Sequence, residues 1–316
     1  MCAGLVAPRR ACLLALASAW LTADTWAQGV AKSPRTRVLA FAQDTLKNDF
    51  RRAQLYEVRD AAAQQPTLSF VYSDAQGQTS LLIHQIEQFI AQKVDVLVLG
   101  TNDEHAVAPV VRKAYQAGIR VIVLDRGIQG QDYSAFIHSD NIHIGAIGAE
   151  FIAKQLKGQG QVLLFEGLQT ADVTHLRSKG FMAVMARHPG IKVIKRTGNY
   201  LRKDALLAMD QLLAQGTRVQ AIFSESDSML SGARVALQNH RIAPTSLITV
   251  GCDYTSEARD AIRNGSQTGS VLFPLGGTQA VAVALQLLAR QAVPKDVLIP
   301  VKLVTRDNVN QVKPIF

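Results

Sequence analysis

The chain of 316 residues is 48% hydrophobic and 19% charged, which fits a soluble globular protein long enough for two domains, each with its own core. No apolar run in it reaches the roughly 20 residues of a membrane-spanning helix. The formal net charge is +9, but the lysines and arginines are scattered rather than clustered. We therefore do not expect a nucleic-acid-binding protein.

The N-terminus has the layout of a secretory signal peptide. Arg9 and Arg10 precede a short apolar run at residues 11–17, and small residues lead to Ala27. A basic region, a short apolar core and small residues before the cleavage site are typical of such a signal, and the core is too short for a membrane anchor. We predict export of the chain and removal of residues 1–27 by cleavage near Ala27.

After a polar leader at residues 28–36, strands and helices alternate with about 30 residues per unit. The strands of the first half are predicted at residues 38–42, 68–72, 94–99 and 119–124. The helices between them are predicted at residues 50–63, 81–91 and 107–117. This alternation indicates stacked β-α-β units and a parallel sheet.

The alternation is interrupted near residues 136–141 and then starts again. The strands of the second half are predicted at residues 162–165, 191–194, 221–223, 247–250 and 269–273, followed by a last extended segment at 297–303. The helices are predicted at residues 144–156, 176–186, 205–213, 229–238, 257–263 and 279–290. Two similar halves without a long linker indicate an α/β protein of two doubly wound lobes with a cleft between them.

Polar side chains follow the predicted strands. The buried strand at residues 120–124 stops at Asp125 and Arg126, and ligands of open α/β sheets bind beyond the carboxyl ends of the strands. The other residues at such ends are Asp44, Thr45, Asn48, Phe50, Thr101, Asn102, Asp103, Gln169, Thr170, Arg177, Tyr200, Arg202, Ser224, Glu225, Ser226, Asp227 and Asp253. Hydrogen-bonding groups of both charges, together with aromatic faces, suit a neutral polyhydroxylated ligand.

Several of these residues also have a purely structural interpretation, which the sequence leaves open. The alternatives are helix N-caps for Asp44, Asn102 and Asp227, core positions for Phe50 and Tyr200, a solvated charge for Arg177 and a surface position for Glu225.

Five motifs in order, at residues 44–50, 123–126, 139–141, 177–181 and 250–253, resemble those of ribose-binding-type periplasmic proteins. These are the solute-binding components of sugar ABC transporters, related to the effector domains of lactose-repressor-type regulators. The resemblance implies the type I periplasmic binding protein fold, with two Rossmann-like lobes joined by three crossings near Ser139-Asp140, Leu272-Phe273 and Pro300. One lobe would comprise residues 36–139 plus 273–300, and the other residues 140–272 plus 301–316.

The resemblance also implies a set of ligand contacts. They are Asp44, Asn48, Phe50, Asp125, Arg126, Arg177, Tyr200 and Asp253, with Ser226 added as a site residue. The chain departs from ribose binders at four positions: Gly100 and Ser226 replace asparagines, Leu272 replaces a pocket glutamine, and Arg51 replaces a second stacking phenylalanine. These departures argue against ribose itself and indicate a larger sugar, a sugar acid or a non-sugar such as a signalling diol.

No catalytic or metal motif accompanies these residues. The chain contains no Gly-x-Ser-x-Gly, Gly-x4-Gly-Lys or His-Glu-x2-His sequence, and its seven histidines show no metal-ligand spacing. Cys2 and Cys12 would leave with the signal peptide, so that Cys252 has no partner for an internal disulfide. We interpret Cys252 as a buried small hydrophobe and expect neither a cofactor nor a metal.

Three hypotheses for the function follow. The first is a periplasmic transport protein that closes on a sugar-like molecule and delivers it to an ABC permease in the inner membrane. The second is a periplasmic sensor of the same fold that partners a receptor kinase or chemoreceptor. The third, an exported hydrolase, is disfavoured because the catalytic motifs are missing. We expect a monomer that binds no nucleic acid.

Overall fold

The computed structural model describes residues 36–316. The predicted signal peptide and its cleavage site lie outside the described residues. Within residues 36–316 the strands form two six-stranded sheets, and no helix there is long and apolar enough to cross a membrane. The predicted α/β class with two doubly wound parallel-sheet lobes is confirmed.

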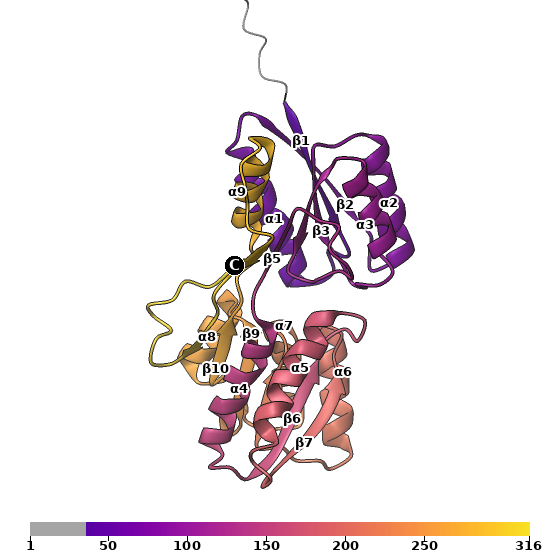
Figure 1. Ribbon diagram of the computed structural model, residues 1–316. Coiled ribbons are helices and arrows are strands. Elements are labelled where there is room, and N and C mark those ends of the chain that lie inside the picture. Colours follow the sequence, from indigo (N-terminus) through magenta and orange to yellow (C-terminus); the bar gives the residue numbers. More distant parts are fainter. Residues whose placement is uncertain (1–35) are drawn as a thin grey trace, which may run out of the picture. The chain divides into compact units, whose positions relative to one another are not determined.

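The first sheet has the strand order β11-β5-β4-β3-β1-β2, and all its strands run parallel. We call this sheet and its helices the first lobe. Its elements are β1 (Arg37–Gln43), α1 (Asp49–Ala63), β2 (Leu68–Asp74), α2 (Thr79–Ala91), β3 (Val96–Gly100), α3 (Ala108–Gln116), β4 (Arg120–Leu124), β5 (Ala135–His138), α9 (Gly277–Leu288) and β11 (Asp296–Leu298). In Figure 1 the gold helix α9 lies beside α1, although the two are far apart in the sequence.

The second sheet has the equivalent order β12-β10-β9-β8-β6-β7, with β12 antiparallel to β10. We call this sheet and its helices the second lobe. Its elements are α4 (Asn141–Gln155), β6 (Gly160–Glu166), α5 (Asp172–Met185), β7 (Ile191–Thr197), α6 (Arg202–Ala214), β8 (Ala221–Ser224), α7 (Asp227–Asn239), the 3-10 turn η1 (Pro244–Ser246), β9 (Ile248–Asp253), α8 (Ser256–Asn264), β10 (Gly269–Leu272) and β12 (Lys302–Thr305).

Both faces of each sheet are covered by helices, which explains the nearly continuous apolar strands. In β1, Leu39 and Phe41 pack on the face of α1 and α9, whereas Ala40 and Ala42 pack on the face of α2 and α3. The second sheet is covered by α4 and α5 on one face and by α6 and α7 on the other. Because the central strands β3 and β4 are buried on both sides, polar side chains lie at or beyond their ends.

Within residues 36–316 the chain passes between the two lobes three times. It crosses from β5 to α4, from β10 to α9 and from β11 to β12. The expected crossing near Pro300 is present, since β11 and β12 on either side of it belong to different sheets. Pro300 stands between them and has no N–H group to continue a ladder. The short strand β5 fills the interruption in the predicted alternation.

Candidate functional site

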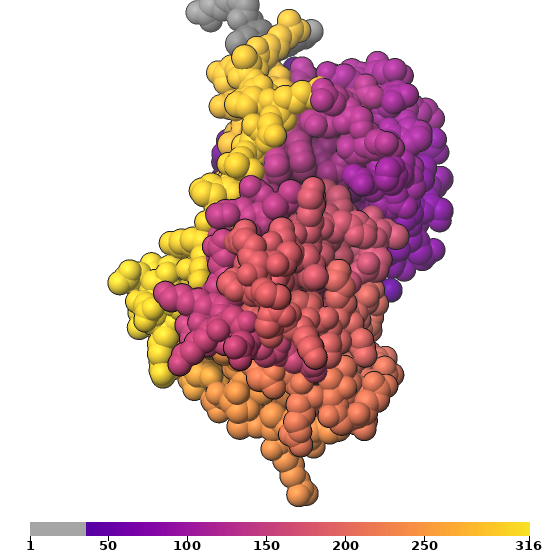
Figure 2. Space-filling view, turned by 60° about the horizontal axis from the view of Figure 1, so that its bottom comes forward, coloured from indigo at the N-terminus to yellow at the C-terminus, as the bar shows by residue number. Residues whose placement is uncertain are grey.

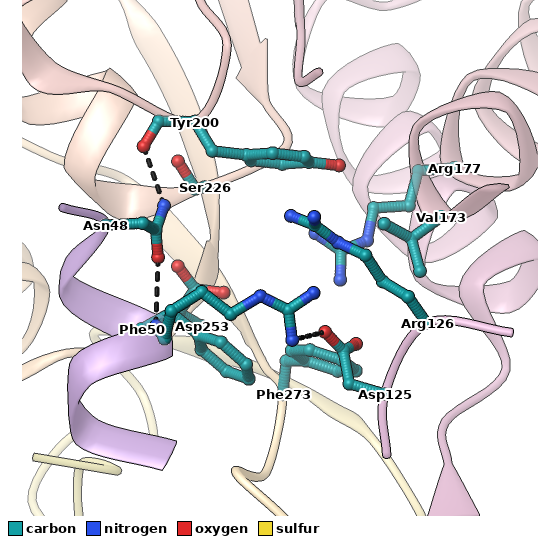
Figure 3. Close-up of a pocket in the computed structure, with 11 residues that line it drawn as sticks. Asn48, Phe50, Asp125, Arg126, Val173, Arg177, Tyr200, Ser226, Asp253 and Phe273 are labelled. Atoms are coloured by element: carbon teal, nitrogen blue, oxygen red, sulfur yellow. Dashed lines mark hydrogen bonds and ion pairs between the residues drawn. The ribbon is translucent and has the colours of Figure 1, made fainter. Parts of the chain in front are cut away.

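A small cavity lies between the carboxyl ends of the strands of the two lobes (Figure 3). The first lobe contributes Asn48, Phe50, Arg51, Asp125 and Arg126, the second lobe contributes Val173, Arg177, Tyr200, Ser226 and Asp253, and Phe273 comes from the connection between β10 and α9. Eight of the nine predicted site residues therefore line one cavity. Asp44 is the exception and lies behind Arg126.

Two aspartates enter the cavity from equivalent places in the two sheets. Asp125 follows β4 and Asp253 ends β9, and each of these strands is the third in its sheet. Both residues have a positive φ, 72° for Asp125 and 106° for Asp253. Backbone angles of this kind are rare outside glycine and concentrate at functional sites. Burial raises the pKa of Asp253 well above its usual value.

Four charged residues form a buried network on the first-lobe side. Asp44 accepts a hydrogen bond from Nη1 of Arg126 at 3.1 Å and lies 3.4 Å from Nε of Arg51. Arg51 in turn pairs through Nη1 with Asp125 at 2.8 Å. Burial raises the pKa of Asp44, whereas the two arginines act in the opposite direction. The network fixes the Arg126 guanidinium at the cavity wall.

Arg177 reaches the cavity from the second turn of α5. Its Nε donates to Oδ1 of Asn141 at 2.8 Å and its Nη1 donates to the backbone oxygen of Glu225 at 2.7 Å. The guanidinium also lies over the Phe273 ring, 4.6 Å from its centroid. Since Arg177 is only 3% exposed, the alternative of a solvated charge is wrong.

In the motif at residues 177–181, the residues after Arg177 explain how the fold positions that arginine at the cavity. A Cβ atom on Gly180 would lie 1.9 Å from the backbone oxygen of Ile142, so only glycine lets α5 approach α4 so closely. Phe181 then stacks on Phe223 in the core, with ring centroids 5.0 Å apart. The close helix contact and the core ring hold the part of α5 that carries Arg177.

Tyr200 forms one wall of the cavity. A Cβ atom on Gly167 would lie 1.9 Å from the Tyr200 ring, so the ring packs against a position where only glycine fits. The hydroxyl group contacts Thr174 at 2.9 Å and donates to Oε2 of Glu225 at 3.3 Å. On the cavity side, the Arg126 guanidinium lies 5.3 Å from the ring centroid.

Glu225 is fully buried behind Tyr200 and neither lines the cavity nor reaches the surface. Its carboxylate accepts hydrogen bonds from the backbone N–H of Gly167 at 2.8 Å and from the hydroxyl of Ser178 at 3.0 Å. Burial raises the pKa of Glu225 to about 7. The sequence-based alternative of a surface position is therefore wrong.

Two predicted site residues cap helices that begin at the cavity. Asn48 caps α1 by accepting from the N–H of Arg51 at 3.0 Å, and Ser226 caps α7 by accepting from the N–H of Met229 at 3.2 Å. Asn48 also donates to the backbone oxygen of Tyr200 at 2.8 Å, which links the lobes.

The N-cap alternatives for Asp44, Asn102 and Asp227 are wrong. Asp44 belongs to the buried charge network, and the N-cap position of α3 is Val107 rather than Asn102. Asp227 is the first residue of α7, and its buried carboxylate accepts from the backbone N–H of Tyr254 at 2.7 Å. That bond holds the turn after Asp253. Burial raises the pKa of Asp227 to about 6.

Further hydrogen bonds join the lobes around the cavity. Thr170 donates to the backbone oxygen of Asn102 at 2.7 Å, and the N–H of Gly127 donates to Asp172 at 2.8 Å. Figure 2 shows first-lobe atoms, indigo to purple, lying against salmon second-lobe atoms on the face in view. The lobes are thus in direct contact.

The sequence did not identify Arg51, Val173 or Phe273 as cavity residues. Arg51 had been noted only as the replacement of a stacking ring. Leu272 was expected in the pocket, but it packs beside the cluster of Tyr254 and Ile262, and the next residue, Phe273, lines the cavity instead. The predicted strand at residues 269–273 included Phe273, whereas β10 ends at Leu272, so the position of Phe273 just after the strand was not visible in the sequence.

Cys252, as predicted, is a buried core residue and is fully inaccessible. Among residues 36–316, no group of three or more His, Cys, Asp or Glu side chains is arranged to hold a metal ion. The cavity therefore offers hydrogen bonds, charges and ring faces to a small polar molecule.

Comparison with known proteins gives consistent similarities. Residues 39–292 match the family model described as periplasmic binding protein domain. The chain is 27% identical to the ribose import binding protein of Bacillus subtilis strain 168, over 85% of this chain and 87% of the relative. It is 28% identical to the D-apiose import binding protein of Paraburkholderia graminis, over 93% of this chain and 95% of the relative.

A solved structure shows the same architecture. It is that of an ABC transporter solute binding protein from Bacillus halodurans C-125 with bound myo-inositol, which is 27% identical to this chain. The TM-score is 0.84, and the match covers 89% of this chain and 98% of the other. The similarity therefore extends over both lobes.

Proposed function

We propose that this chain, which belongs to the family of periplasmic binding protein domains, binds a small sugar or sugar-like molecule between its lobes and delivers it to an ABC importer. Relatives named as import binding proteins support transport and do not favour the sensing alternative. The family and these relatives are binding proteins, which supports a role without catalysis. The proposed location is the periplasm, and the proposed partner is a permease in the inner membrane.

One observation carries this proposal. Hydrogen-bonding groups from both lobes converge on one cavity and still have capacity for a ligand. Within residues 36–316, Nη2 of Arg126 and Nη2 of Arg177 have no hydrogen-bond partner, and Oδ1 of Asp125 is buried without one. Donors beside acceptors match the hydroxyl groups of a polyol, and such charge-assisted hydrogen bonds are strong.

The proposed mechanism is closure of the lobes on the ligand. Residues 36–139 plus 273–300 would move as one body and residues 140–272 plus 301–316 as the other. Arg126 would hold the ligand from the first lobe, and Arg177 and Asp253 from the second. A ligand that contacts both lobes stabilises the closed arrangement alone, so binding shifts the population toward it. We propose that the protein acts as a monomer.

A thermal-shift screen against pentoses, hexoses, sugar acids and small diols tests the proposal, followed by calorimetry of Arg126→Ala with the best ligand. Loss of this buried hydrogen-bonding charge is expected to cost about 2–4 kcal/mol of binding free energy. Arg112→Ala is the matched control, because Arg112 forms an exposed ion pair with Asp132 in the same lobe. Near-normal affinity of Arg126→Ala for a ligand that binds the wild type would refute the site.

A further inference from the structure

Asp253 lies in the cavity at the turn that follows β9 (Figure 3). Its φ is 106°, and that of the next residue, Tyr254, is 64°. The Asp227 carboxylate holds this turn, because its Oδ2 accepts hydrogen bonds from the backbone N–H groups of Tyr254 at 2.7 Å and Thr255 at 3.3 Å. Asp227 itself does not line the cavity. Its carboxylate therefore shapes the cavity through this turn.

Two buried side chains fix the Asp227 carboxylate. Nε2 of Gln267 donates to Oδ1 at 2.8 Å, and the hydroxyl of Ser270 donates to Oδ2 at 2.7 Å. The space for the carboxylate comes from Gly251 in β9, since a Cβ atom there would lie 1.9 Å from Oδ1 of Asp227. Gln267 is only 1% exposed, and its Nε2 also donates to the backbone oxygen of Gly269 at 3.0 Å. Both N–H groups of this amide are thus engaged, which fixes its orientation.

From Gln267 a path of polar groups leads to the surface of the second lobe. Its Oε1 accepts from Nη1 of Arg234 at 2.5 Å, and Nη2 of Arg234 donates to Glu257 at 3.0 Å. Glu257 also accepts from both terminal nitrogens of Arg202, at 2.8 and 3.1 Å. Ser231 forms hydrogen bonds with Arg202 and Glu257. The exposed fraction of the side chain rises outward, from 9% for Arg234 to 45% for Arg202.

Arg202 anchors the outer end of this path. A Cβ atom on Gly232 would lie 2.1 Å from the backbone oxygen of Arg202, so α6 begins directly against α7. The Arg202 guanidinium also lies 3.5 Å from Asp49 of the first lobe. The path therefore joins the turn at Asp253 to the border between the lobes.

We propose that Gln267 and Arg234 are positioning residues for ligand binding, which hold Asp253 in place through Asp227. The proposal rests on the proposed function and adds to it residues that affect the ligand without lining the cavity. Removal of either side chain leaves a buried polar partner without its hydrogen bond, which is costly. The turn then samples other conformations, and Asp253 leaves the place where it meets a ligand.

Gln267→Met tests the positioning without any ligand. Methionine keeps a similar volume and removes both hydrogen-bonding groups of the amide. Hydrogen exchange at the N–H groups of Tyr254 and Thr255 is expected to become at least about tenfold faster, because Asp227 is no longer fixed. The acceleration should exceed that in the neighbouring strand β8, which reports general loss of stability.

Calorimetry with D-ribose, L-arabinose, D-glucose and myo-inositol tests the effect on binding. Gln267→Met and Arg234→Met are each expected to lower the affinity for the best of these compounds by at least about tenfold. Because both residues act along one path, the double variant should lose much less than the product of the two single losses.

Gln161→Met is the matched control, because Gln161 donates to the backbone oxygen of Arg218 at 2.8 Å near the start of β6, at the end of the sheet opposite the cavity. It should change neither the exchange at the turn nor the affinity. If Gln267→Met melts far below the wild type, Gln267→Glu replaces it, which keeps an acceptor for Arg234 but turns an acceptor toward Asp227.

The outcomes separate the two proposals. Unchanged exchange at Tyr254 and Thr255 overturns the positioning, and faster exchange with unchanged affinity overturns its role in binding. Fully multiplicative losses in the double variant overturn the shared path. If the wild type binds none of these compounds nor any other sugar or polyol, the proposed function fails and the role in binding with it, whereas the exchange rates still decide whether Gln267 holds the turn.

Discussion

Glu225 is a buried acid whose protonation makes the stability of the fold depend on pH. The folded chain holds the proton of Glu225 up to a pKa of about 7, whereas the usual value is 4.5. Between these values the folded state binds more protons than the unfolded state, so the free energy of unfolding falls as the pH rises. The shift lowers the free energy of unfolding by about 3 kcal/mol for this one group. This loss of stability is complete above pH 7 and absent below pH 4.5.

Glu225→Gln is therefore expected to flatten the pH dependence of stability. Its carbonyl oxygen can accept from the N–H of Gly167 while its amide faces Ser178, so the site stays hydrogen-bonded. Urea unfolding at several pH values from 5 to 8 measures the change. Wild-type stability should fall by about 2.5 kcal/mol more than that of the variant across this range. Equal slopes for the two proteins would contradict the assignment, and the exposed Glu150→Gln serves as control.

The contact between α4 and α5 places Arg177 within the cavity. Gly145 mirrors Gly180 in this contact, because a Cβ atom on Gly145 would lie 2.0 Å from the backbone oxygen of Arg177 itself. The arginine and the residue at which its helix meets α4 are thus one structural unit. A change at the contact moves the side chain that is proposed to hold the ligand.

Gly180→Ala tests this unit. The new methyl group must separate the two helices, and overpacking of this kind costs about 1–3 kcal/mol of stability. We expect ligand affinity to fall by at least about tenfold, because Arg177 shifts with α5. Chemical unfolding and calorimetry measure the two effects. Lys179→Ala, which changes an exposed residue on the same helix, should alter neither stability nor ligand affinity. Unaltered affinity of a destabilised Gly180→Ala would show that the helix contact does not position Arg177.

The sequence predicts those elements whose local pattern is strong. Long apolar strands such as β4 and amphipathic helices such as α2 were identified because burial on one or both faces leaves a periodic signal. The strand β5 has only four residues, and it pairs with β4 and β11 only in the folded chain. Its identification requires knowledge of these neighbouring strands.

The same distinction applies to the cavity. Asp125, Arg126 and Asp253 were predicted because strand ends are visible in the sequence. Arg51 was missed because its role depends on two aspartates from other elements, which no local pattern connects. Residues that act through distant partners are hidden in a single sequence, whereas residues defined by their place at a strand end are not.

At the scale of the whole molecule, some contacts between the lobes lie outside the cavity. Asp49 in the first turn of α1 accepts from the hydroxyl of Ser228 at 3.0 Å and lies 3.5 Å from the Arg202 guanidinium. Both partners belong to the second lobe. Asp49 does not line the cavity. Its contacts therefore stabilise the arrangement in which the lobes touch, although Asp49 itself does not contact a ligand.

Asp49→Ala is expected to weaken ligand binding by about two- to fivefold, the range for a partly exposed ion pair. The loss should arise from faster dissociation with unchanged association, because the contact forms only after the lobes meet. Stopped-flow measurements with the best ligand separate the two rates. Asp260→Ala removes an exposed pair within one lobe and should leave both rates as they are. A slower association with normal dissociation would speak against this role of Asp49.

The last strands of the chain complete both sheets. β11 pairs with β5 at the edge of the first sheet, and β12 pairs with β10 at the edge of the second. During synthesis on the ribosome, neither lobe can acquire its outermost strand until almost the whole polypeptide has emerged. Premature termination before residue 296 would therefore damage the two halves at once, including the half that was made first.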